Sequence, residues 1–134
     1  MSKICHLRLT CSNEKEADKV ANALLVKHLV ACVRQMPVSS SYWWKGEGLR
    51  SRSSFAKATE DSLLGLSKKS AKEGKIEKNN EVLLEMLSRL DYFEQIEKAV
   101  TKLHSYDTFV LEALPVSKIS KDAQKWLSRE LKNG

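Results

Sequence analysis

The sequence has few of the residues that mark disulfide-bonded or phosphate-binding proteins. It contains 3 cysteines, 2 prolines and 5 glycines in 134 residues. The cysteines form no CxxC pair, and an odd number of isolated cysteines argues against a disulfide framework, so we expect reduced thiols. No nucleophile elbow, glycine-rich phosphate loop or paired-carboxylate motif occurs in the chain. The sequence therefore favours a protein that is not an enzyme.

Long apolar runs are absent as well. No segment approaches the roughly 20 apolar residues of a membrane-spanning helix. The amino-terminal stretch MSKICHLRLT lacks the continuous apolar segment of a signal peptide. We therefore expect a cytoplasmic protein that does not contact a membrane. The length suits one domain with a core of its own, and we predict a single domain over residues 1–134.

Charge of either sign is not concentrated in any one segment. The chain has 23 Lys and Arg against 17 Asp and Glu, a formal net charge of +6. A basic excess indicates nucleic-acid binding only where it is clustered, and here basic and acidic residues are interleaved. This arrangement is typical of a solvated surface, so we do not expect nucleic acid as a partner.

The pattern that is present alternates strands and helices. Cys5, Leu7, Leu9 and Cys11 occupy every second position of residues 4–11, which predicts a strand with one face on a core. The predicted order is strand 4–11, helix 12–28, strand 29–46, strand 75–87, helix 90–104, strand 108–116 and helix 120–132.

Single residues predict where these elements begin and bend. Ser12 or Asn13 is placed to cap the first helix, Asp91 the second and Ser120 the third. Pro37 lies in the middle of the second strand. Because proline cannot donate a hydrogen bond to a neighbouring strand, Pro37 predicts a bulge or an edge position.

Two βαβ halves joined by a long hairpin predict an α+β fold. The arrangement is ferredoxin-like, with a four-stranded antiparallel sheet, the first two helices on one face and an additional C-terminal helix. The other face of the sheet is then bare. In a chain of this size such a face usually packs against another subunit, so we expect an oligomer.

Residues 47–74 interrupt the predicted hairpin. This segment, EGLRSRSSFAKATEDSLLGLSKKSAKEG, has no apolar period. If it is removed, Gly46 joins Lys75 and a continuous hairpin with glycine at its turn results. We therefore predict an insertion at a hairpin tip, where added length costs little. The segment is interpreted as a mobile loop, or alternatively as an arm that docks a protein partner or contacts phosphates.

Several short motifs occur along the rest of the chain. They are Thr10 at the end of the first strand, LVACV at 29–33, SYWWKG at 41–46, Glu81 before an apolar strand, LHSYDT at 103–108, LPV at 114–116 and Trp126-Leu127. In this order and spacing the chain resembles the CutA family, the divalent-cation tolerance proteins. The resemblance implies a ferredoxin-like subunit in a homotrimer with clefts at its interfaces. It also implies a response to copper and other divalent cations, and an architecture similar to that of the PII signalling proteins.

The resemblance also implies candidate metal ligands. Cys32 and His104 occupy the family's cysteine and histidine positions, and Glu81 offers a carboxylate. Thiolate and imidazole together suit copper or zinc, which makes either ion a possible cofactor. The alternatives are structural. Cys32 would then be a small buried side chain, His104 would interact with a helix dipole, and Glu81 would be paired with a basic residue of another subunit.

The aromatic residues are interpreted as structural or as part of a subunit interface. Strand alternation sends Tyr42 and Trp44 to one side and Trp43 to the other, so they do not form a single stacking platform. We expect Tyr106 to anchor its loop through a hydroxyl hydrogen bond, and Trp126 to pack in the last helix.

Some positions depart from the family pattern. Ser105 replaces a proline, Phe109 and Val110 replace a Pro-Glu pair, and Leu87 replaces a lysine. These changes remove a cation and an acid from the implied cleft.

Two functions are therefore carried forward. The first is a trimeric protein that binds divalent metal, copper foremost, and the second is a PII-like trimer that binds a small anionic metabolite or a protein partner.

Overall fold

A computed structural model of the protein describes residues 3–44 and 74–132. The elements are β1 (Ile4–Cys11), α1 (Glu14–Val26), β2 (Cys32–Trp44), β3 (Lys75–Arg89), the 3-10 helix η1 (Leu90–Tyr92), α4 (Phe93–Leu103), β4 (Leu111–Pro115) and α5 (Lys121–Glu130). This order agrees with the prediction, including the additional C-terminal helix.

The described strands form a four-stranded antiparallel sheet in the order β2-β3-β1-β4. The sheet confirms the predicted ferredoxin-like α+β fold. Strands β2 and β3 pair without a break from Cys32 opposite Leu87 to Trp44 opposite Lys75. The strands on either side of the predicted insertion are thus paired up to their ends, as a hairpin requires. Residues 47–73 of that insertion lie outside the described residues.

Strand β2 lies at an edge of this sheet. Pro37 is opposite Val82, and the register with β3 is continuous on both sides of this pair. An edge strand has one side without a partner, so a residue that lacks an N–H group is tolerated there. The edge position predicted from Pro37 is therefore confirmed, and the alternative of a bulge is wrong.

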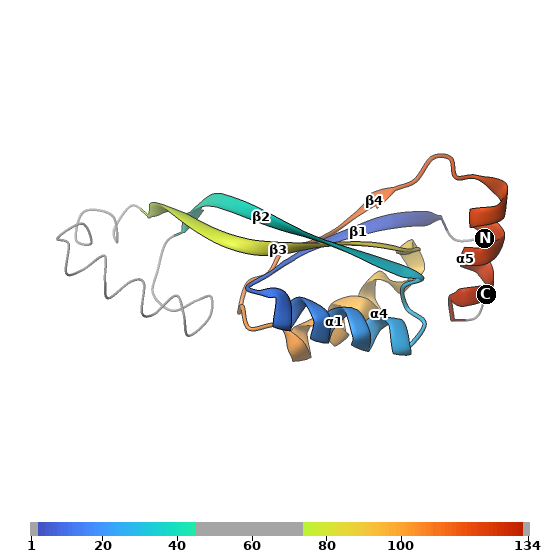
Figure 1. Ribbon diagram of the computed structural model, residues 1–134, viewed down its shortest axis with the longest axis horizontal. Coiled ribbons are helices and arrows are strands. Elements are labelled where there is room, and N and C mark those ends of the chain that lie inside the picture. Colours follow the sequence, from blue (N-terminus) through green and yellow to red (C-terminus); the bar gives the residue numbers. More distant parts are fainter. Residues whose placement is uncertain (1–2, 45–73, 133–134) are drawn as a thin grey trace.

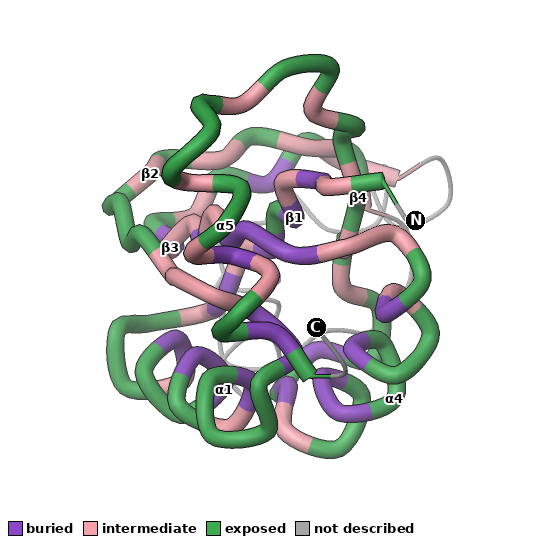
Figure 2. The backbone as a smooth tube through the Cα atoms, turned by 90° about the vertical axis from the view of Figure 1, so that its right-hand side faces the viewer, coloured by how far each residue is buried: buried purple, intermediate pink, exposed green. Residues whose placement is uncertain are grey.

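The core lies between the sheet and two helices. Cys5, Leu7, Leu9 and Cys11 of β1 are fully buried and face α1 and α4, as the alternation predicted. Figure 2 shows the buried residues concentrated where these helices meet the sheet. Each large apolar side chain that is fully buried in this layer contributes about 1.5–3 kcal/mol. The main contributors besides β1 are Val20, Leu24, Leu84, Met86, Ile96 and Val100.

Only some of the predicted helix N-caps are confirmed. Asn13 caps α1, and its side chain accepts a hydrogen bond from the Glu16 N–H at 2.8 Å, as predicted. Asp91 does not cap α4, which is preceded by η1, and instead forms an ion pair with Arg89 at 2.7 Å. Ser120 occupies the N-cap position of α5, but its side chain makes no capping bond within the described residues.

Helices α1 and α4 cover one face of the sheet, and α5 lies at one end of it (Figure 1). In the described part of the chain no helix covers the opposite face, which we call the open face. Arg8, Arg34 and Glu85 form ion pairs there, at 3.3 Å and 3.9 Å. The bare face predicted from the topology is thus present. Among the described residues, no helix has the length and apolarity that crossing a membrane requires.

Candidate metal centre

Three potential metal ligands converge beside the end of β1. One ligand atom each from Cys11, Glu16 and His104 lies within 4.8 Å of the others. This group, called the cluster below, is the only such group of three in residues 3–44 and 74–132. It combines a thiol, a carboxylate and an imidazole, which is a donor set that suits copper and zinc.

Local structure explains why these residues meet. Cys11 is the last residue of β1 and points toward the helices. The Asn13 cap turns the chain directly into α1, which places Glu16 in the first helical turn beside the strand end. Helix α4 packs alongside α1 and ends at Leu103, so His104 at its C-cap reaches the same point.

The Glu16 carboxylate is held by hydrogen bonds from two segments. Its Oε1 accepts from the Ser12 N–H at 3.0 Å and from the Ser12 hydroxyl at 3.2 Å. Its Oε2 accepts from the Ser105 N–H at 2.8 Å. Burial opposes ionisation, but these bonds together with the nearby His104 ring outweigh it and lower the pKa of Glu16 below its ordinary value. Glu16 therefore joins β1, α1 and the segment after α4 as an ionised acceptor.

The hydrogen bonds of His104 define its tautomer. The Tyr106 N–H donates to Nδ1 at 3.0 Å, so Nδ1 carries a lone pair. The proton is then on Nε2, which donates to the Thr10 carbonyl oxygen at 2.8 Å. The ring also stacks on Phe109, with centroids 5.2 Å apart and an interplanar angle of 24°. His104 is thus a buried imidazole held through both ring nitrogens, and its Nδ1 lies 3.6 Å from Glu16 Oε1.

The Cys11 thiol holds its proton more tightly than an ordinary cysteine. Burial, followed by the charges of Glu16 and Glu81, raises its pKa to about 12. Burial also raises the pKa of Cys5, to about 11, with a smaller contribution from Asp91. A metal ion at the cluster would have to displace the Cys11 proton, so its affinity would rise with pH.

We predict from this burial that Cys11 is almost inert to thiol reagents in the native state. A pKa shift from 9.0 to about 12 lowers the thiolate fraction about a thousandfold. At pH 8 the reaction of Cys11 with dithionitrobenzoate should be slower by at least this factor than in guanidinium-unfolded protein. Cys32, which is half-buried, serves as the reference thiol. Equal native rates for Cys11 and Cys32 would contradict the geometry.

Tyr106 connects the cluster to a further carboxylate. Its hydroxyl donates to Glu81 Oε2 at 2.6 Å, while its main-chain N–H is bonded to His104. This is the hydroxyl anchor that the sequence predicted. Glu81 lies on β3 one residue before Val82, which pairs with Cys11. Its side chain is buried, with 6% of the residue exposed. Of the predicted ligands, the structure thus brings His104 and Glu81 to the same region, with Tyr106 between them.

Within one chain the structure does not bring Cys32 to His104. Cys32 is opposite Leu87 on β3, whereas Cys11, beside His104, is opposite Val82. Five residues along a strand correspond to about 16 Å. A site that combines Cys32 with His104 can therefore form only between two copies of the chain.

The remaining aromatic residues lie away from the cluster. Trp43 is 72% exposed, and the half-buried Tyr42 and Trp44 lie on the other side of β2. The rings of Tyr42 and Trp44 are perpendicular, with centroids 6.5 Å apart. Trp126 of α5 packs against the edge of the core. The strand alternation predicted for residues 42–44 is therefore present.

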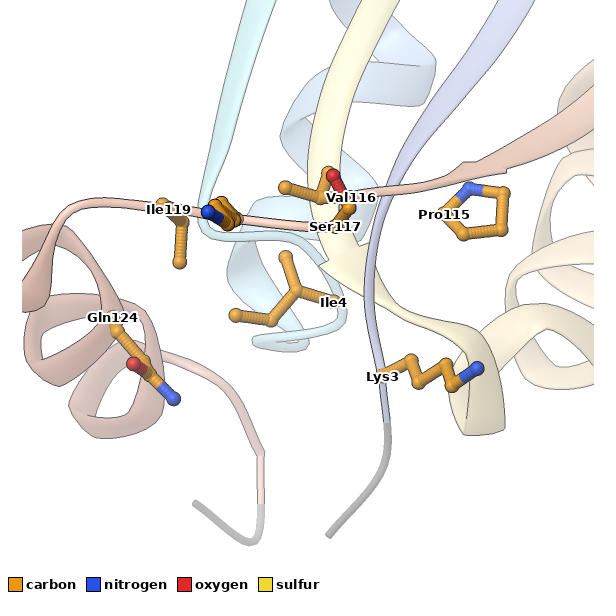
Figure 3. Close-up of a pocket in the computed structure, with 8 residues that line it drawn as sticks. Lys3, Ile4, Pro115, Val116, Ser117, Ile119 and Gln124 are labelled. Atoms are coloured by element: carbon orange, nitrogen blue, oxygen red, sulfur yellow. The ribbon is translucent and has the colours of Figure 1, made fainter.

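A concave surface lies at the opposite end of β1 from the cluster. It has a volume of about 640 Å³ and is lined by segments of β1, the β4–α5 connection and α5. Figure 3 shows Ile4, Ile119 and Gln124 projecting toward the same space. Lys3 and Lys118 contribute to its lining. Its donors are amines, an amide and a hydroxyl, so it suits a small anion rather than a transition metal.

Comparison with known proteins identifies the family. A sequence model of the CutA1 divalent ion tolerance protein matches residues 5–61 and 71–130. The chain belongs to the CutA1 family. Residues 62–70, between the two matched ranges, fall inside the insertion predicted at 47–74, of which residues 47–61 and 71–74 are matched.

Individual CutA relatives match along most of this chain. The divalent-cation tolerance protein CutA of Archaeoglobus fulgidus is 27% identical over 119 residues, 89% of each chain. Protein CutA of Homo sapiens is 28% identical over 120 residues, 89% of this chain and 51% of that protein. The A. fulgidus structure, described as a periplasmic divalent cation tolerance protein, has a TM-score of 0.73 at 25% identity, covering 96% of this chain and 99% of that one. CutA1 from Oryza sativa shares the fold, with a TM-score of 0.75 at 21% identity over 99% and 97% of the two chains.

Two departures from the CutA pattern have direct structural consequences at the cluster. A proline at position 105 could not donate the bond that Ser105 makes to Glu16, because proline has no N–H. Phe109, also at a family proline position, supplies the ring that stacks on His104. At a third departure, Leu87 is 7% exposed and belongs to the core cluster.

The sequence analysis missed two members of the cluster. Cys11 was interpreted only as a core residue of the first strand, and Glu16 only as an acidic residue in the first helical turn. A signal was present, because a glutamate three residues after an N-cap commonly reaches back to the chain before the helix. That signal places Glu16 at the end of the first strand, beside Cys11.

Proposed function

We propose that this CutA1-family chain binds divalent metal ions, copper foremost, and acts in the response to them as a binding protein rather than an enzyme. The observation that carries the proposal is the convergence of Cys11, Glu16 and His104 within 4.8 Å. The names of the CutA relatives, divalent-cation tolerance proteins, point in the same direction.

The surroundings of the cluster fit a metal ligand set. Histidine ligands almost always donate the second ring N–H to a carbonyl or carboxylate, which fixes the tautomer and directs the other nitrogen at the metal. His104 already donates Nε2–H to Thr10 and presents Nδ1 to the cluster. Copper and zinc both accept thiolate, imidazole and carboxylate ligands, so either ion suits this donor set.

We further propose that the protein is a cytoplasmic homotrimer. The open face carries the exposed apolar side chains Met36 and Leu114, which are 39% and 38% exposed. The buried His6 Nδ1 on the same face has no hydrogen-bond partner among the described residues. A second copy of the chain would cover both features. The buried thiols of Cys5 and Cys11 suit a reducing compartment.

The test is a calorimetric titration of thiol-reduced protein with Zn²⁺ and, in parallel, with Cu²⁺. Zinc is included because thiols do not reduce it. Wild-type protein should bind one ion per chain, and Cys11→Ser should weaken binding by about 100-fold or more. Cys32→Ser is the matched control and should leave the isotherm unchanged.

Each other outcome identifies a different error. Loss of binding in Cys32→Ser but not in Cys11→Ser would move the site to the combination of Cys32, His104 and Glu81 between chains. No binding by wild-type protein would reject the proposed function. A solution mass of one chain by light scattering would reject the homotrimer.

The concave surface near Lys3 favours a second candidate function. A PII-like scaffold would hold a small anionic metabolite there, with the amines of Lys3 and Lys118 as donors and Ile4 and Ile119 as an apolar floor. A volume of about 640 Å³ is in the range of small-molecule sites. Under this alternative, Lys118→Ala weakens anion binding and leaves the metal isotherm unchanged.

A further inference from the structure

The main-chain amides after α4 occupy the atoms that a cation at the cluster would need. The Ser105 N–H donates to Glu16 Oε2 at 2.8 Å, and the Tyr106 N–H donates to His104 Nδ1 at 3.0 Å. A metal ion and an amide proton cannot share the single lone pair of Nδ1. Cation binding at the cluster therefore requires the Tyr106 amide to leave, whereas Glu16 Oε2 can accept from Ser105 and bind a cation through separate lone pairs.

The second ring nitrogen of His104 does not relieve this competition. His104 Nε2 carries the proton donated to Thr10 and has no lone pair to offer. The segment 104–106 is thus the part of the site that has to move.

The same segment reaches the open face. The Tyr106 side chain extends to Glu81 on β3, and its hydroxyl bond of 2.6 Å is buried. Glu81 is opposite Val38 in the register of β2 and β3, and its side chain alternates to the face away from α1 and α4. Movement of the Tyr106 amide away from His104 therefore shifts the Tyr106 hydroxyl relative to Glu81 on the open face.

We propose that residues 104–106 form a switch that links the occupancy of the cluster by a divalent cation to the Tyr106–Glu81 contact. This inference depends on the proposed metal binding at the same cluster. With no cation, both amides are bonded to the ligands and Tyr106 is bonded to Glu81. With a cation, the Tyr106 amide is released and the hydroxyl contact is weakened. Because linkage is reciprocal, weakening the contact raises cation affinity by the same factor.

The first test is amide hydrogen exchange measured by NMR with and without Zn²⁺. Exchange at Tyr106 should accelerate at least tenfold when zinc is bound, because this amide loses its acceptor. The amide of Leu9, in the centre of β1, serves as the reference and should not change. Unchanged protection of Tyr106 in protein that binds zinc would overturn the switch and leave the proposed function standing.

The second test uses two matched pairs of variants. Ser105→Pro and Ser105→Ala both remove the hydroxyl, but only proline also removes the N–H. His104 has an extended backbone (φ −79°, ψ 139°), which suits a following proline. Zinc affinity should differ by less than about threefold between Ser105→Pro and Ser105→Ala, because Glu16 Oε2 can accept from the Ser105 N–H and bind zinc through separate lone pairs.

The second pair tests the link to the open face. Tyr106→Phe removes the hydroxyl contact with Glu81 and should raise zinc affinity several-fold. Tyr92→Phe is the control, because the buried Tyr92 hydroxyl has no partner among the described residues. Equal zinc affinity in Tyr106→Phe, Tyr92→Phe and wild-type protein would overturn the link. Absence of zinc binding in wild-type protein would overturn the switch together with the proposed function.

Discussion

Replacing His104 by alanine is expected to destabilise the fold by about 3–5 kcal/mol. The imidazole side chain is fully buried, and its two nitrogens join the end of β1, the end of α4 and the Tyr106 amide. Its removal leaves the Thr10 carbonyl and the Tyr106 N–H without these partners. It also leaves a cavity beneath the Phe109 ring. Chemical unfolding by urea, followed by circular dichroism, measures the loss.

The control for this prediction is His28, a histidine at an exposed position. Its Nδ1 is 2.7 Å from the Glu130 carbonyl oxygen, and its φ of 57° lies in the left-handed region. His28→Asn keeps a residue that tolerates this backbone conformation and should cost less than about 1 kcal/mol. If His104→Ala costs as little as His28→Asn, the imidazole does not bridge the three segments.

Replacing Glu16 by glutamine is expected to cost about 2 kcal/mol at pH 7. Glutamine offers one oxygen, whereas the Glu16 carboxylate accepts with both oxygens from Ser12 and Ser105. In the variant an amide NH₂ group faces one of these N–H donors. The free energy of unfolding at pH 7, compared between wild type and variant, gives the value.

The same variant predicts a specific pH dependence. The pKa of Glu16 is lowered in the folded protein from 4.5, its ordinary value. The stabilisation by ionised Glu16 is therefore fully present above about pH 5 and is lost as the pH falls through the lower folded pKa. The difference in stability between wild type and Glu16→Gln should shrink over this acidic range.

Glu14→Gln is the matched control for both measurements. Glu14 lies in the same turn of α1 and is exposed. Its substitution should change stability at pH 7 by less than about 0.5 kcal/mol. A constant gap between wild type and Glu16→Gln from pH 7 down to pH 3 would show that Glu16 is not held as an ionised acceptor.

Much of the fold could be predicted because local patterns and topology reinforce each other. The alternation of Cys5, Leu7, Leu9 and Cys11 indicates a strand without reference to any other residue. Pro37 indicated an edge or a bulge because proline lacks a donor, and only the register with β3 selected the edge. The Asp91 cap failed because the 3-10 helix η1 precedes α4 and places Tyr92, not Asp91, at the N-cap position of α4.

The candidate site was less predictable. His104 was found through a motif, yet its neighbours come from positions 11 and 16, which lie 93 and 88 residues earlier in the chain. Cys32 was selected because it occupies a family position, but the strand register places it five residues along β3 from the pair formed by Cys11 and Val82. Motifs specify residue types, whereas a ligand set depends on distances between segments.

The amino-acid sequence by itself determined the strands, the helices, the bare sheet face and the family of this protein, because these depend on periodicity and short motifs. Only the tertiary structure decided that Cys11, Glu16 and His104 meet, that the His104 ring bonds to Thr10, and that main-chain amides bond to the ligand atoms. These properties depend on the packing of α4 beside α1 at the end of β1. A one-residue shift of that packing would separate the three side chains without altering any local pattern.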